Sequence, residues 1–217
     1  MVLSQILMRE ETDHKVIRKK YNSFNSYKWL ISPLFRVFYP FAISSKSRLE
    51  RELNFLNSGN EIKKPKVYSF DTSLKEMDRE YIEGDVEYCD GSKTGKLLSS
   101  IHKEGYSLGD SKLDNFICNQ EGAYIIDSEQ AIKSDKKRYN YWDVSFLILS
   151  AAYYNYSNKI GFKRFLEGFS KEYIYWQDYQ KRAIKGIYSL VFLFMPLQHL
   201  YSLKEAISKD NLTVNST

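Results

Sequence analysis

The feature that most constrains this chain is the stretch GDSKLDNF, from Gly109 to Phe116, near the middle of its 217 residues. Asp110 and Asn115 stand five positions apart in it, and Asp127 follows directly after two isoleucines. The stretch lies between an amphipathic segment and a strand-like one, which predicts a loop between a helix and a strand. A loop can turn both polar side chains into one cleft, which a strand would not do at odd spacing.

The segments after this loop predict a metal site. Residues 116–118 and 123–126 are expected to form a hairpin across a turn at 119–122. Pairing would bring Asp127 back beside Asn115, and a carboxylate with an amide oxygen suits Mg²⁺. Phosphoryl transfer needs such a site, an acid near the attacking hydroxyl and a cation on the phosphates. This favours a phosphotransferase over a polar turn in a helical protein.

Composition sets broader limits. The content of 43% hydrophobic and 27% charged residues indicates a globular chain, long enough for one large domain or two small lobes. A net charge of +5 fits an anionic ligand or a membrane surface, and nucleic acid is least favoured because neither end carries a basic tail. Cys89 and Cys118 are too few for a disulfide scaffold, and no signal peptide opens the chain. We therefore expect a cytoplasmic protein with two reduced thiols, Cys118 being packed in an apolar strand.

Periodicity predicts an α+β chain in two parts that meet near Gly84. Residues 1–84 are expected to form a small mixed lobe, with strands at 2–8, 15–21, 66–70 and 77–82, a charged turn at 9–14, an insert at about 22–47 and a helix at 47–58. Residues 85–217 are expected to form a larger helical lobe, with helices at 95–102, 139–154, 162–173 and along 176–207. The apolar run 186–201 is expected to be a buried helix, because Pro196 and His199 interrupt it as a membrane span.

From His102 to Asp127 the pattern H-x-x-G-x-x-x-G-D-x-x-x-x-N resembles the catalytic core of the protein-kinase-like superfamily. It is similar to compact atypical branches: the RIO kinases, the small kinase of the tRNA threonylcarbamoylation complex and the lipopolysaccharide core heptose kinases. The resemblance implies a bilobal kinase-like fold, ATP with Mg²⁺ or Mn²⁺, Asp110 as catalytic aspartate, and Asn115 and Asp127 as metal ligands. Lys112 would reach the transferred phosphate, as the matching lysine does in Ser/Thr protein kinases; the alternative is a solvated loop lysine.

The same resemblance requires a lysine on a strand of the small lobe and a glutamate on the following helix. Alternation along the second predicted strand places Ile17, Lys19 and Tyr21 on one face, so Lys19 would reach the phosphates. A slip of one residue would change this choice. Glu52 lies beside the leucine stripe of the predicted helix and needs an interior partner, which Lys19 supplies, whereas Glu50 falls on the solvent side.

Two further segments fit the family. The run EYIEG at 80–84 resembles the hinge of the tRNA-modification kinase, so backbone groups of Glu80 and Ile82 would bind adenine. Asp143 would hold the backbone amides of the catalytic loop; the alternative is an acid at a helix N-terminus that the helix dipole favours. His102 is expected to be a packing residue rather than a metal ligand.

The chain departs from the family in three places. Residues 1–58 contain no glycine, so the turn at 9–14 would cover the phosphates in place of a glycine-rich loop. Asp127 is followed by Ser-Glu instead of Phe-Gly, and Glu129 would either add a second carboxylate or face solvent. The activation segment is short and lacks an A-P-E triplet, which disfavours a peptide groove. Leu108 replaces a common scaffold histidine.

The aromatic segment from Tyr27 to Ile43 has several interpretations. It could be a substrate lid, a partner site or a helix touching a membrane surface, and packing onto the small lobe is somewhat favoured. The leading hypothesis is an ATP-dependent phosphotransferase, atypical Ser/Thr protein kinase-like, with an unknown hydroxyl acceptor. That acceptor is a protein side chain, favoured by Lys112, or a sugar or lipid-linked hydroxyl, favoured by the short activation segment. The alternative from another class is a nucleotide-binding pseudokinase that acts through a partner.

Overall fold

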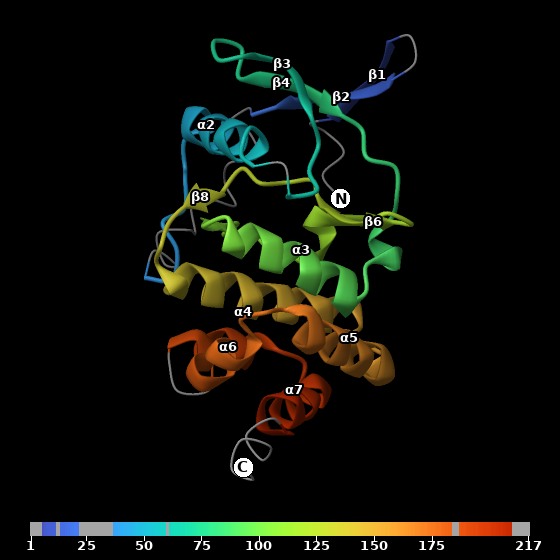
Figure 1. Cartoon of the computed structure of the whole chain (residues 1–217), viewed down its shortest axis with the longest axis vertical. Coiled ribbons are helices and arrows are strands. Elements are labelled where there is room, and N and C mark those ends of the chain that lie inside the picture. Colours follow the sequence, from blue (N-terminus) through green and yellow to red (C-terminus); the bar gives the residue numbers. More distant parts are fainter. Residues whose placement is uncertain (1–5, 12–13, 22–36, 60, 184–186, 210–217) are drawn as a thin grey trace.

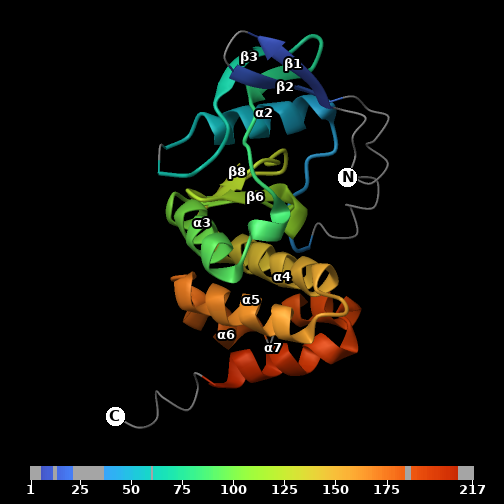
Figure 2. The same cartoon turned by 90° about the vertical axis from the view of Figure 1, so that its right-hand side faces the viewer.

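The computed structural model describes residues 6–11, 14–21, 37–59, 61–183 and 187–209. A small sheet lies at one end of the long axis, helix α2 lies beneath it, and the other helices are stacked toward the opposite end (Figure 1). A view turned by 90° shows the same order of layers (Figure 2). The predicted α+β class is confirmed, and the division into two lobes at Gly84 stays a prediction.

The sheet is antiparallel, with strand order β1-β2-β4-β3. Its strands are β1 (Ile6–Glu11), β2 (His14–Lys20), β3 (Val67–Asp71) and β4 (Glu76–Glu80). The predicted charged turn at 9–14 is wrong, because β1 continues to pair with β2 as far as Glu11 opposite His14. The connection itself, residues 12–13, lies outside the described residues, as does the predicted strand start at 2–5.

Helix α2 (Ser45–Leu56) begins where the hydroxyl oxygen of Ser44 accepts a hydrogen bond from the backbone N–H of Ser47, at 3.1 Å. The predicted leucine stripe is buried, and Glu52 lies on the same buried face. Glu50 is exposed, as predicted, and Lys46 lies 3.9 Å from it one helical turn away. The helix therefore presents a carboxylate, rather than only apolar groups, to the space beneath the sheet.

The middle layer holds helix α3 and two short strand pairings. Helix α3 (Gly91–Lys103) follows the short 3₁₀ helix η4 (Val86–Tyr88). The predicted hairpin is confirmed as β6 (Phe116–Asn119) and β7 (Gly122–Ile125). Strands β5 (Tyr106–Ser107) and β8 (Ile132–Lys133) also pair. This pairing was not predicted, because segments of two residues are too short to show a periodic pattern.

The chain passes very close to β6 just after residue 84. Gly84 has φ +153°, and a Cβ there would lie 2.5 Å from the carbonyl oxygen of Cys118, so only glycine fits. Asp85 then pairs with Cys118, which brings Cys89 within reach, and Cys89 and Cys118 form a disulfide. The expectation of two free thiols is wrong, although Cys118 is fully buried as predicted. The count of cysteines could not reveal this pairing, because it arises from the close passage of the two segments.

The remaining helices cover the lower half of the molecule. They are α4 (Lys137–Tyr154), α5 (Lys159–Glu172), α6 (Trp176–Ala183), the 3₁₀ helix η6 (Ile187–Phe194) and α7 (Leu197–Lys209), whereas the short 3₁₀ helix η5 (Leu113–Asn115) directly precedes β6. The prediction of one buried helix over residues 186–201 is wrong: the run breaks at Pro196, which has no backbone N–H to continue a helix. Phe194 and Leu197 on either side of the break are 66% and 85% exposed. Within the described ranges, none of the helices has both the length and the apolar character to cross a membrane.

Candidate active site

The backbone before Asp110 is held by a carboxylate on α4. Asp143 is fully buried, and its two oxygens accept hydrogen bonds from the backbone N–H groups of Leu108, at 2.6 Å, and Gly109, at 2.7 Å. The indole N–H of Trp142 donates to the carbonyl oxygen of Gly109 at 2.7 Å. The predicted contact between Asp143 and the loop amides is confirmed. The helix-dipole alternative is wrong, because α4 begins six residues earlier, at Lys137.

Gly109 allows a close approach that no other residue could make. Its φ is +73°, and a Cβ there would lie 2.3 Å from the ring of Tyr39. The hydroxyl group of the fully buried Tyr39 lies 2.9 Å from the carbonyl oxygen of Ser107 and 2.8 Å from that of Gln130. The tyrosine ring therefore joins the catalytic loop to the segment that follows Asp127.

Tyr39 belongs to the aromatic insert, whose packing differs from the prediction. The ring of Phe38 lies 5.3 Å from that of Trp142, and the ring of Phe41 lies 5.9 Å from it. The described end of the insert thus packs onto α4 and the catalytic loop instead of the small lobe, because its aromatic rings meet the rings of α4. Residues 22–36 lie outside the described part of the chain.

His102 is a buried packing residue, as predicted. Its Nδ1 lies 2.7 Å from the hydroxyl of Tyr173, and its Nε2 lies 3.1 Å from Oδ2 of Asp143. His102 therefore helps to position the carboxylate of Asp143, which in turn holds the backbone of Leu108 and Gly109. Among the residues that the structure describes, no group of three or more histidine, cysteine or acidic side chains could hold a metal ion.

The loop brings three of the predicted site residues together. Asp110 is nearly buried, and the ammonium of Lys112 lies 3.5 Å from its Oδ2. Burial lowers the pKa of Lys112, but the carboxylates of Asp110 and Asp127 outweigh this and raise its pKa above the ordinary value. The side-chain N–H of Asn115 donates to the backbone carbonyl of Asp110 at 2.6 Å, so the atom Asn115 can offer to a cation is Oδ1.

The hairpin returns Asp127 to this loop. The backbone N–H of Ile126 donates to the carbonyl oxygen of Asn115 at 2.9 Å, directly beyond the paired residues Phe116 and Ile125. Asp127 therefore leaves β7 beside Asn115, as predicted. One carboxylate and one amide oxygen, with phosphate oxygens and water, form a donor set that Mg²⁺ accepts, so the residues fit the predicted metal.

Lys19 joins the sheet, α2 and the hairpin in one buried ion-pair group. Its ammonium lies 2.7 Å from Oε2 of Glu52 and 2.9 Å from Oδ1 of Asp127. Burial lowers the pKa of Lys19, but the carboxylates of Asp127 and Glu52 outweigh burial and hold this pKa above its ordinary value. Tyr21 also donates a hydrogen bond to Glu52. The predicted strand register, with Lys19 and Tyr21 turned inward, is confirmed, whereas the catalytic roles stay predictions.

Two charged residues around this group, Arg79 and Arg48, were missed. Arg79 on β4 donates to Oε1 of Glu52 at 2.9 Å, and Arg48 on α2 lies 3.0 Å from the buried carboxylate of Glu129. Burial and the charge of Asp127 raise the pKa of Glu129. The interpretation of Glu129 as solvent-facing is wrong, because Arg48 pairs with it inside the protein. Arg48 stands four residues before Glu52 and so shares its helix face, a signal that could have identified it.

The predicted adenine contacts are only partly available. The backbone N–H of Glu80 donates to the carbonyl oxygen of Lys66 at 2.9 Å, and that of Tyr81 donates to Lys15 at 3.1 Å. An adenine could therefore use the carbonyl of Glu80 but not its N–H group. Ile82 follows the strand, half-buried, and its role stays a prediction.

Neither a protein-family model nor a curated protein sequence matches the chain. Among solved structures it is similar to the bifunctional kinase-methyltransferase WbdD, with a TM-score of 0.45 and 16% identity over 77% of this chain and 42% of that one. A 2.2 Å structure of WbdD gives a TM-score of 0.48, 13% identity, and 95% and 49% coverage. WaaP in complex with acyl carrier protein gives 0.43, 11%, 95% and 85%. The chain spans less than half the length of WbdD. Similarity at TM-scores below 0.5 does not assign a function to this chain.

Proposed function

We propose that this chain is a Mg²⁺- and ATP-dependent phosphotransferase that acts on a hydroxyl group. The observation that carries the proposal is the ion-pair group in which Lys19 contacts both Glu52 and Asp127. In the proposed reaction Lys19 would be the cation for the phosphates, beside Asp127 as the metal-binding carboxylate, and Asn115 adjoins that carboxylate across the hairpin. A structural role alone would not require Lys19 to lie between the carboxylates of Glu52 and Asp127, next to the loop that carries the carboxylate of Asp110.

The reaction needs one proton acceptor and one cation on the catalytic loop. Asp110 accepts the proton of the attacking hydroxyl, whose oxygen forms a bond to the γ-phosphorus while the bond to the β–γ bridging oxygen breaks and ADP leaves with that electron pair. Lys112, which keeps its charge beside Asp110, stabilises the negative charge on the transferred phosphoryl group. Bound Mg²⁺ would neutralise charge on the β- and γ-phosphates, and Asn115 and Asp127 would hold it there.

A non-protein hydroxyl is the favoured acceptor. Only residues 128–136 separate Asp127 from α4, and β8 in that segment is paired with β5. This leaves little chain to form a groove for an extended peptide. The sugar or lipid-linked alternative therefore fits this segment better than a protein Ser/Thr acceptor.

The proposal is tested by autophosphorylation and ATP hydrolysis with γ-labelled ATP. Wild-type protein with Mg²⁺ or Mn²⁺ should release or incorporate label, EDTA should abolish this, and Asp110→Asn should lower the rate at least about 100-fold because it removes the proton acceptor. Asp135→Asn, at an exposed acid outside the loop, is the control and should react as wild type does. Equal rates for Asp110→Asn and wild type would refute the proposal.

A nucleotide-binding module without transfer is the second candidate. It is favoured by the hydrogen bond that Lys19 donates to Oδ1 of Asp127, because this bond occupies an oxygen that a metal ion would need. Binding of ATP with Mg²⁺ would have to move Lys19 from Asp127 to the phosphates. Calorimetric binding of ATP together with no label transfer above the Asp110→Asn background would establish this second candidate instead.

A further inference from the structure

A hollow of about 470 Å³ opens beside the catalytic loop, and we call it the α4 groove. Its wall consists of Phe146, Leu149, Tyr153 and Tyr154 of α4, and Lys112 and Asp114 line the end that belongs to the loop. This volume is within the range of about 300–1,000 Å³ that small-molecule sites occupy. Because Lys112 also lies 3.5 Å from Asp110, the groove leads directly to the proposed proton acceptor.

The groove is lined mainly by aromatic rings and aliphatic groups, and the hydroxyl of Tyr153 already donates to the carbonyl oxygen of Phe194. Ser150 is the polar residue of its wall, and its hydroxyl already accepts from the backbone N–H of Leu113 at 2.8 Å and donates to the carbonyl of Leu147 at 2.9 Å. The charged residues of the lining, Lys112 and Asp114, lie at the end nearest the loop. A molecule that fits is therefore apolar along most of its length and polar at the end that reaches Asp110.

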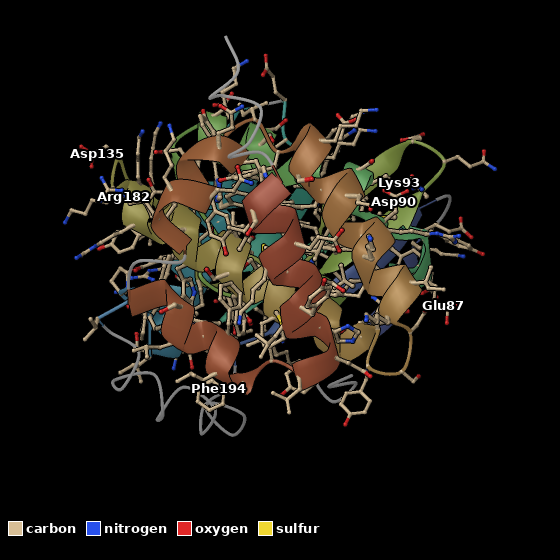
Figure 3. The ribbon with its side chains drawn as sticks, turned by 90° about the horizontal axis from the view of Figure 1, so that it is seen from below. Glu87, Asp90, Lys93, Asp135, Arg182 and Phe194 are labelled. Carbon is tan, nitrogen blue, oxygen red and sulfur yellow. A yellow bond between two sulfur atoms is a disulfide. The ribbon has the colours of Figure 1, made fainter. Side chains whose placement is uncertain are left out.

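The wall of the groove is fixed relative to the catalytic loop. The ring of Phe146 is stacked on that of Trp142 at 5.4 Å, and Trp142 donates its indole N–H to Gly109 in the loop. At the other end the hydroxyl of Tyr153 donates to the backbone carbonyl of Phe194, at 2.5 Å. Phe194 itself projects outward from the edge of the helical layer (Figure 3). The aromatic wall is thus held in place at both ends, so the groove is expected to keep its shape when it is empty.

We propose that the α4 groove binds an apolar portion of the acceptor, such as an acyl or alkyl chain, and so places the acceptor hydroxyl at Asp110. This inference rests on the proposed function and narrows its substrate class to a hydroxyl compound that carries an apolar chain. Tyr153 and Tyr154 are about half exposed, so in the absence of this chain their rings meet water. Binding of an apolar chain would remove these rings from water, and this burial would contribute favourably to the free energy of binding.

The test uses methyl, hexyl and octyl β-D-glucoside below the concentrations at which they form micelles. Isothermal titration calorimetry should show tighter binding with chain length, by up to about fourfold for each methylene buried. In the assay with γ-labelled ATP, transfer to octyl glucoside should exceed transfer to methyl glucoside. Equal binding of all three glucosides would overturn the inference, and this comparison needs no variant of the protein.

Variants locate the binding surface. Tyr154→Ala should weaken octyl glucoside binding roughly tenfold. Tyr156→Ala removes a more exposed ring just beyond the same helix, outside the groove, and should leave binding unchanged. Thermal melting of both variants checks that they fold. Equal losses in the two variants would overturn the inference. Chain-length-dependent binding with neither release of label from γ-labelled ATP nor transfer to the glucoside would support the groove and refute the proposed function, so the two failures are distinguishable.

Discussion

At the scale of single residues, Gly109 decides how the catalytic loop can approach its support. A side chain there would both force an L-residue to φ +73° and press on the ring of Tyr39. Gly105 is a natural control, because its φ is +79° but the nearest side-chain atom to its Cβ position is 4.0 Å away. A side chain at either position would therefore strain the backbone to a similar extent, but only at Gly109 would it also clash with a neighbouring ring.

Gly109→Ala is expected to lower the free energy of unfolding by roughly 1–3 kcal/mol more than Gly105→Ala, which carries only the left-handed backbone cost of about 1–2 kcal/mol. Urea unfolding of both variants measures the difference. Phosphotransfer should also fall in Gly109→Ala, since Asp110 is the next residue. If the two substitutions cost the same, the contact between Tyr39 and the loop is not tight in solution.

At the scale of elements, periodicity was sufficient where one face of a segment is buried. The leucines of α2 and the alternation of β2 placed Glu52 and Lys19 correctly, because each element has a solvent side for contrast. Periodicity was insufficient for the bond between Cys89 and Cys118 and for the contact of Tyr39 with the loop, since both depend on where distant segments meet. The core of the predicted site and its support by Asp143 were therefore accessible from sequence, whereas the disulfide and the contact of Tyr39 were not.

The position of α2 depends on two buried ion pairs rather than one. Arg48 pairs with Glu129 at 3.0 Å, and Glu52 pairs with Lys19 at 2.7 Å. Breaking a buried pair leaves an uncompensated charge, whereas replacing both partners by apolar residues is often neutral. The segment after Asp127 is thus attached to the helix that supports Lys19.

Arg48→Met is expected to lower the free energy of unfolding by about 3 kcal/mol and to raise the KM for ATP, because the buried Glu129 loses the guanidinium 3.0 Å from it and α2 shifts, while the Lys19 ammonium lies farther away, at 4.0 Å. Arg48→Met with Glu129→Leu should regain most of the stability. Glu50→Ala, on the exposed face of the same helix, is the control and should change stability by less than about 0.5 kcal/mol. Urea unfolding and steady-state kinetics provide both readouts, and a double variant no more stable than Arg48→Met would contradict the pairing.

At the scale of the whole molecule, the disulfide between Cys89 and Cys118 closes a loop across a sequence separation of 29. This loop contains α3 and the catalytic loop, and it ends in the hairpin that carries Asp127 back to Asn115. The bond therefore restricts the unfolded chain around Asp110, Lys112 and Asn115 of the proposed site. On the loop-entropy estimate, a closure of this length stabilises the folded state by about 3–4 kcal/mol.

Reduction with dithiothreitol is expected to lower the urea midpoint of unfolding by the equivalent of about 3–4 kcal/mol, while the native fold persists at low urea. The double variant Cys89→Ser/Cys118→Ser should unfold as the reduced protein does and should not respond to dithiothreitol, which separates loss of this bond from other effects of the reductant. Because Cys118 lies in β6, the reduced protein should also open the hairpin more often, and exchange of the Ile126 amide, which donates to the carbonyl of Asn115 across the hairpin, should accelerate. Identical unfolding curves with and without reductant would show that the two sulfurs are not bonded in solution.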